Sequence, residues 1–152
     1  NPFASLMFIG EAPGAEEDRI GIPFVGDAGK KLDEIISAMG MQRDDVYIAN
    51  VLKSRPPNNR TPTPEEIRHC APFLTQQVAI VQPKVIVALG SPAAKFLLQT
   101  SRGITQLRGS WGTFEGISVM PTFHPAYLLR NYTKEIRAQT WSDMQQVMEK
   151  LR

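Results

Sequence analysis

Residues 6–14 of the chain are Leu-Met-Phe-Ile-Gly-Glu-Ala-Pro-Gly. The first four form a continuous apolar run that stops at a glycine, a pattern typical of a strand buried on both faces of a parallel sheet. The loop that follows begins with Glu11 and contains Pro13 and Gly14, which favour turns. This stretch therefore predicts a central strand with a polar loop at its carboxyl end.

Strands and helices alternate along the rest of the chain. Apolar runs at 46–49 and 85–89 predict two further strands, and 111–114 and 117–120 flank a hairpin turn at Glu115-Gly116. Spacing and end signals predict the following helices: 27–39 with Asp27 as N-cap and Gly40 as stop, 64–81 with a capping box at 63–66, a short helix from Ser91, and a closing helix over 141–151.

This alternation predicts a three-layer α/β/α sandwich with a small, mainly parallel four-stranded sheet. We expect 53–62 and 121–131 to be loops. The length of 152 residues fits a single domain over 1–152, and because the chain starts at Asn1 we expect a further segment to precede it.

The composition is that of an ordinary soluble domain, with 42% hydrophobic and 21% charged residues. No apolar run approaches the roughly 20 residues that cross a bilayer, so we expect no membrane partner. A net charge of +2 is too small to indicate nucleic acid by itself. The single cysteine excludes an internal disulfide and a cysteine-only metal site within this chain, and it fits an intracellular setting.

Polar residues follow the predicted strands where each of them ends. These positions are Gly10-Glu11, Asn50, Gly90 and 122–124. Ligands of open α/β sheets bind beyond the carboxyl ends of the strands, so we expect the functional site there. Neither a Gly-x-Gly-x-x-Gly pattern after a strand nor a P-loop is present, which argues against a standard phosphate-binding loop.

A set of short segments occurs on these strand ends. The segments are GEAPGAEED at 10–18, GIPFVG at 21–26, YIANVLK at 47–53, RPP at 55–57 and FHPAYLLR at 123–130. In this order they resemble the family 4 uracil-DNA glycosylases of bacteria and archaea, and the resemblance covers nearly the whole chain, including Leu107-Arg108-Gly109. It implies a monofunctional repair enzyme that flips uracil out of DNA and hydrolyses its N-glycosidic bond, leaving an abasic site.

The resemblance implies a pocket for the flipped base. Phe24 is expected to stack on the pyrimidine, and Ala12 to lie in the wall of the same pocket. Asn50 is expected to recognise uracil, because one amide matches both the O4 acceptor and the N3–H donor. Better-known uracil glycosylases have an Asp at the position of Ala12, so here no carboxylate can orient water from that position.

Two kinds of side chain are expected to promote cleavage. Negative charge develops on uracil and positive charge on the sugar, so a donor near O2 and a carboxylate near the sugar both stabilise the transition state. His124 resembles the family histidine placed against O2. Glu11 is expected to supply the carboxylate, with Glu17 as a second candidate, whereas His69 is expected to be a solvated structural residue.

DNA contacts are expected from loops around this pocket, and the partner is uracil-containing DNA, single- or double-stranded. We expect a monomer in the cytoplasm of a bacterial or archaeal cell. Leu128 or Leu129 is expected either to wedge into the base stack or to pack in the core. Four cations are expected to contact phosphates: Lys53, Arg55, Arg108 and Arg130.

Family 4 enzymes hold a 4Fe–4S cluster on four cysteines, although the hydrolysis itself needs no cofactor. Cys70 matches one of them, Ser54 stands where the family has another, and the upstream pair is absent from this chain. A hydroxyl is a poor iron ligand, so a complete cluster is not expected here. Cys70 also falls on the apolar stripe of its predicted helix, which favours a buried structural thiol.

Two alternatives stay open. The same fold could excise hypoxanthine or another deaminated purine, although Asn50 favours uracil. The chain could also be a DNA-binding relative that has lost catalysis, with Ser54 as an early sign. The joint presence of Glu11, Asn50 and His124 argues against that loss.

Overall fold

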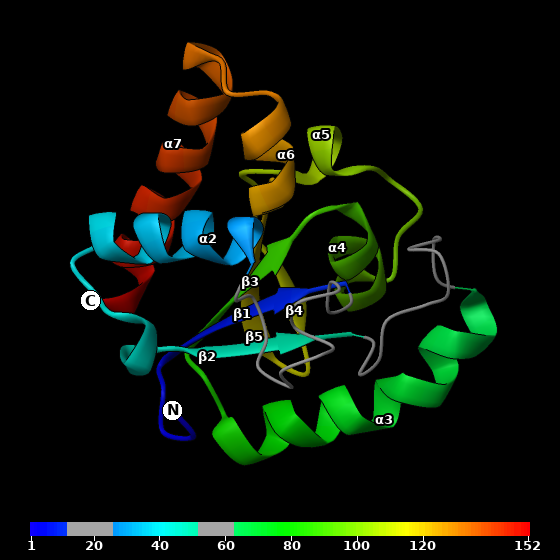
Figure 1. Cartoon of the computed structure of the whole chain (residues 1–152). Coiled ribbons are helices and arrows are strands. Elements are labelled where there is room, and N and C mark those ends of the chain that lie inside the picture. Colours follow the sequence, from blue (N-terminus) through cyan, green and yellow to red (C-terminus); the bar gives the residue numbers. More distant parts are fainter. Residues whose placement is uncertain (12–25, 52–62) are drawn as a thin grey trace.

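A single mixed sheet organises the fold, with helices on both of its faces (Figure 1). The computed structural model describes residues 1–11, 26–51 and 63–152. The strands are β1 Leu6–Gly10, β2 Tyr47–Asn50, β3 Val85–Leu89, β4 Gly112–Phe114 and β5 Ile117–Thr122. The helices are α2 Asp27–Ala38, α3 Pro64–Val81, α4 Ser91–Leu98, α5 Ile104–Leu107, α6 Pro125–Arg130 and α7 Lys134–Leu151, with a 3-10 turn at Arg43–Asp45.

The strand order is β2-β1-β3-β5-β4. The first four strands in this order pair in parallel, and only β4 pairs antiparallel, with β5. The sheet therefore has five strands where we predicted four, because the predicted hairpin adds β4 at the edge. Its turn is confirmed, since Glu115 and Gly116 both have positive φ (51° and 79°), as a tight hairpin turn requires.

Alternating side chains of the strands build one core on each face of the sheet. From β1, Met7 and Ile9 join the core that contains residues of α3 and α4. Leu6 and Phe8 join the core that contains residues of α2 and α7. All four side chains are completely buried, so the predicted three-layer α/β/α sandwich is confirmed.

Local signals at the helix ends are mostly confirmed. Thr63 forms the predicted capping box with Glu66, and Gly40, with φ of 80°, follows the end of α2. The N-cap of α2 is Gly26 rather than Asp27, which is the first helical residue. Asp27 instead places its negative charge in the first turn, where the helix dipole favours it.

The prediction of a loop over 121–131 was wrong. Strand β5 continues to Thr122, and residues 125–130 form α6. Pro121 is tolerated because the described β4 pairing covers only 117–119, so the missing N–H of Pro121 would face a side where the described residues form no partner strand. Its carbonyl accepts from the Gly109 N–H on that side, at 3.2 Å. Pro125 starts α6 at the first helical position, where no N–H is needed.

Within the part of the chain that the structure describes, the helices are too short or too polar to cross a bilayer.

Candidate active site at the carboxyl edge of the sheet

Parallel pairing brings the ends of four strands to one edge of the sheet. Gly10 pairs with Asn50, and the Val51 N–H donates to the Gly10 carbonyl at 2.8 Å. On the other side of β1, the end of β3 is joined to β5, because the Gly90 N–H donates to the Thr122 carbonyl at 2.9 Å. The predicted residues Glu11, Asn50 and His124 are therefore brought to the same edge.

His124 is the N-cap of α6. Its Nδ1 accepts the Ala126 N–H at 2.9 Å, which fixes the orientation of the ring. A neutral imidazole that accepts at Nδ1 carries its proton on Nε2. The second nitrogen is then a hydrogen-bond donor whose direction is set by the backbone.

The environment of His124 keeps the ring uncharged. Burial, together with the positive charge of Arg130, lowers the pKa of His124 from its ordinary value to about 4. At neutral pH the imidazole is therefore neutral. Such a group can stabilise an oxyanion by donating a hydrogen bond without offering a full positive charge.

Gly90 makes room for His124. A Cβ atom at this position would lie 3.1 Å from the His124 Cβ, and Gly90 has φ of 90°, where side chains are strained. The end of β3 thus needs glycine for two reasons, and one of them is the packing of His124.

Asn50 and Glu11 occupy the neighbouring strand ends. Asn50 is the last residue of β2 and is only 7% exposed. Glu11 directly follows β1 and is half-buried, and burial raises the pKa of its carboxyl above the ordinary value. A carboxylate with a raised pKa is a stronger base than one in water, which suits a role in orienting or deprotonating water.

A buried ion pair holds the end of β5 against α7. Asp143 of α7 is completely buried and accepts two bonds from Arg108, at 2.6 Å from its Nη2 and 3.1 Å from its Nε. It also accepts the Thr122 hydroxyl at 2.6 Å. Thr122 lies two residues before His124, so this network fixes the strand that leads into the His124 turn.

Arg108 therefore has a partner inside the protein, and its predicted phosphate contact stays a prediction. Sequence reasoning missed Asp143 and Thr122. One signal was available in the sequence. Asp143 stands beside Met144, on the side of the predicted closing helix that was expected to be buried, and a buried carboxylate requires a hydrogen-bonding or charged partner.

The two leucines of α6 have different environments. Leu128 is only 2% exposed, and Leu129 is 49% exposed. The structure thus supports the core alternative for Leu128, because α6 turns it toward α2, and leaves Leu129 as the candidate wedge. Arg130 is exposed at the end of α6, where its predicted phosphate contact stays a prediction.

Several predicted residues lie outside the described part of the chain, in 12–25 and 52–62. They are Ala12, Glu17, Phe24, Lys53, Ser54 and Arg55. Their roles stay predictions.

The residues present do not fit the four-thiolate cluster of the family. Cys70 is the one cysteine of the chain, and it lies half-buried on α3. Among residues 1–11, 26–51 and 63–152, no three His, Cys, Asp or Glu side chains are grouped to hold a metal ion. We therefore derive no catalytic step through a cluster.

Comparison with known proteins agrees with this geometry. The sequence model of the uracil DNA glycosylase superfamily matches residues 1–151. A type-4 uracil-DNA glycosylase of Thermotoga maritima is 50% identical over 144 residues, which cover 92% of this chain and 74% of the relative. That of Archaeoglobus fulgidus is 42% identical, with coverage of 98% and 78%. The chain belongs to the uracil-DNA glycosylase superfamily and to its type-4 branch.

Proposed function

We propose that this chain removes uracil from DNA by hydrolysing the N-glycosidic bond, with Asn50, His124 and Glu11 acting at the carboxyl edge of the sheet. The family to which it belongs is a family of hydrolases acting on N-glycosyl bonds. The observation that carries the proposal is the orientation of the His124 ring, whose Nδ1 accepts the Ala126 N–H, on the same edge as the buried Asn50. The lowered pKa of His124 is consistent with this role.

The roles follow from where charge develops. As the bond between N1 of uracil and C1′ breaks, its electron pair moves onto the base, and negative charge accumulates on O2. The Nε2–H of His124 donates to O2 and stabilises that charge. Asn50 donates to O4 and accepts from N3–H, which selects uracil over cytosine because cytosine carries a donor at position 4.

Glu11 acts on the sugar side of the bond. Its carboxylate stabilises the cationic sugar and orients the water whose oxygen bonds to C1′. The proton released by that water passes to the carboxylate and then to solvent, and uracil takes up one proton as it leaves. The products are an abasic sugar and free uracil.

The base must leave the stack to reach this edge. Leu129 is exposed on α6, five residues after His124, and would enter the gap that the nucleotide leaves. Phe24 would stack on the flipped base.

The direct test measures free uracil released from an oligonucleotide with one uracil, with strand scission by alkali as a second readout. We expect release by the wild-type chain and a loss of at least a hundredfold in His124→Ala. No release at excess protein would contradict the proposal.

Base selectivity needs a separate measurement. Matched oligonucleotides with uracil, cytosine or hypoxanthine compete for the protein, and we expect release of uracil alone. Asn50→Ala should lose most of the activity on uracil, while its thermal midpoint of unfolding shows whether the fold is retained. Faster release of hypoxanthine would assign the chain to deaminated purines.

A further inference from the structure

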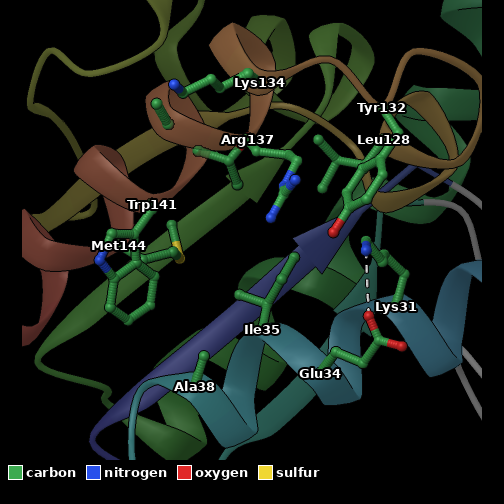
Figure 2. A pocket seen from close by; sticks show the side chains of 12 residues that line it. Lys31, Glu34, Ile35, Ala38, Leu128, Tyr132, Lys134, Arg137, Trp141 and Met144 are labelled. Atoms are coloured by element: carbon green, nitrogen blue, oxygen red, sulfur yellow. Dashed lines mark hydrogen bonds and ion pairs between the residues drawn. The ribbon is translucent and has the colours of Figure 1, made fainter.

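A groove between α2 and α7 is lined by residues that have no role in the reaction proposed above. It encloses a cavity of about 640 Å³ and is lined from both helices and from the turn after α6. Figure 2 shows Lys31 on α2 pointing toward Tyr132, with Arg137 reaching from α7 toward the same place. We call it the α2–α7 groove, and the residues used below are Lys31, Tyr132, Lys134, Arg137, Trp141 and Met144.

Helical spacing places these groups on facing stripes. Lys134, Arg137, Trp141 and Met144 are three or four residues apart, so they lie along one face of α7. On α2 the lining positions are 31, 34, 35 and 38, which share one face for the same reason. Each stripe is polar in its first turns and apolar further on.

Cations gather at one end of the groove. The Lys31 Nζ lies 3.9 Å from the centre of the Tyr132 ring, and the Arg137 Cζ lies 4.7 Å from it. Lys134 also lines the groove, although its ammonium points away from the Tyr132 ring (Figure 2). Glu34, the one carboxylate among the lining residues, binds Lys31 at 3.1 Å. The lining thus carries a net positive charge, which fits an anion.

The other end of the groove is flat and apolar. Trp141 is 37% exposed, one helical turn beyond Arg137, and the buried Met144 lies next to it along the stripe. A cationic end followed by an exposed aromatic ring is the combination that proteins use for single-stranded nucleic acid, with phosphates on the cations and bases on the ring.

The groove also adjoins the active-site edge. Helix α2 packs against α6, and α7 begins four residues after α6 ends, so the cationic end of the groove lies beside the helix that His124 caps. Leu128, which lines the groove, is four residues after His124 on α6. The six residues of α6 span about 9 Å, so a strand bound at His124 passes close to the cationic end.

We propose that the α2–α7 groove binds unpaired nucleotides of the DNA strand that flanks the uracil. The inference rests on the proposed function and adds to it a substrate class, single-stranded DNA beside the excised base. The excess of cations and the neighbouring active-site edge favour a DNA strand over an acidic peptide, which becomes an outcome of the test.

The test uses the fluorescence of Trp141. The chain has two tryptophans, so Trp111→Phe leaves Trp141 as the single emitter. A twelve-residue oligothymidylate without uracil is titrated into this variant. We expect saturable quenching, because bases stack near the Trp141 ring, and at least tenfold weaker binding after Arg137→Glu. The slope of log affinity against log salt should fall by about 0.7 for each phosphate that the variant no longer neutralises.

The matched control is Arg152→Glu, which makes the same charge change at the far end of α7 and should leave binding unchanged. If Trp111→Phe fails to fold, fluorescence anisotropy of labelled oligothymidylate with Arg137→Glu in the otherwise natural chain gives the same comparison. Because the probe holds no uracil, the result is independent of uracil release. The proposal is overturned by equal binding in Arg137→Glu and Arg152→Glu, or by tighter binding of an oligoglutamate peptide of equal length.

Discussion

Helix α6 connects the carboxyl edge of the sheet, where His124 caps it, to the α2–α7 groove, which Leu128 lines, and the chemistry of the two regions differs. At the edge, His124 is partly buried, its ring is oriented by the Ala126 N–H, and its lowered pKa favours the neutral imidazole. In the groove, Arg137 and Lys134 are exposed and positively charged. A preorganised hydrogen-bond donor best stabilises charge that appears only in the transition state. Phosphates carry their charge permanently, and cationic side chains bind them. The edge should therefore control the rate of cleavage, and the groove should control affinity and its salt dependence.

The largest expected effect comes from removing the donor at the edge. His124→Ala should lower kcat by about 10²–10³, or about 2.7–4 kcal/mol, as expected for one oxyanion donor. KM and its salt dependence should change little, because the groove is untouched. Steady-state kinetics at two salt concentrations measure both.

His124 also caps α6, so its removal could act through the helix. His124→Asn provides the control, since Asn is a good N-cap but lacks the imidazole Nε2–H. We expect it to restore stability without restoring kcat. A fully active His124→Ala would contradict the role of the edge.

The next largest effect is expected from the hydrogen-bond network of Asp143, Arg108 and Thr122, which joins β5 to α7. Asp143→Ala leaves Arg108 and the Thr122 hydroxyl without their shared partner, and should lower the free energy of unfolding by about 3 kcal/mol. Glu149→Ala, on an exposed position of the same helix, should stay within about 0.5 kcal/mol of the wild type. Denaturant unfolding measures both, and equal stability of the two variants would show that the network does not anchor β5.

Two glycine substitutions are expected to have a smaller effect, and comparing them separates the cost of backbone strain from the effect of the packing of His124. Gly90→Ala and Gly40→Ala both place a side chain at positive φ, which costs about 1–2 kcal/mol. Only Gly90 faces His124, and nothing lies within 4 Å of a Cβ at Gly40. Both variants should lose stability, and only Gly90→Ala should also lose kcat. Equal kcat of Gly90→Ala and Gly40→Ala would show that Gly90 does not support catalysis through the packing of His124.

The functional residues at the carboxyl edge of the sheet could be predicted from the sequence better than the helices and ion pairs around them. Glu11, Asn50 and His124 could be found because each follows a short apolar strand, and parallel pairing then brings strand ends together. Helix α6 was missed because two prolines in 121–131 indicated a loop. Pro125 in fact stands at the first helical position, directly after the N-cap His124. A proline at this position is a helix-start signal, but we interpreted it as a loop residue.

Other features depend on tertiary packing. The spacing of residues in α7 does not reveal that α2 lies opposite, so the groove could not be predicted. The Arg108–Asp143 pair joins residues 35 positions apart, and no local pattern connects them. The pKa of His124 is lowered mainly by burial, which local sequence does not reveal, and to a smaller extent by Arg130 at the end of the same helix.

The neutral state of His124 is the central claim, and nuclear magnetic resonance of its ring tests it directly. In His69→Gln, His124 is the only histidine, because the chain has two. The folded-state pKa is lowered, so the unfolded chain binds the proton first as pH falls, and stability should be lost between about pH 6.5 and about 4. Nitrogen-15 shifts should show a ring protonated at Nε2 that stays neutral until about pH 4. Titration of the ring near pH 6.5, or a proton on Nδ1 at neutral pH, would contradict the account.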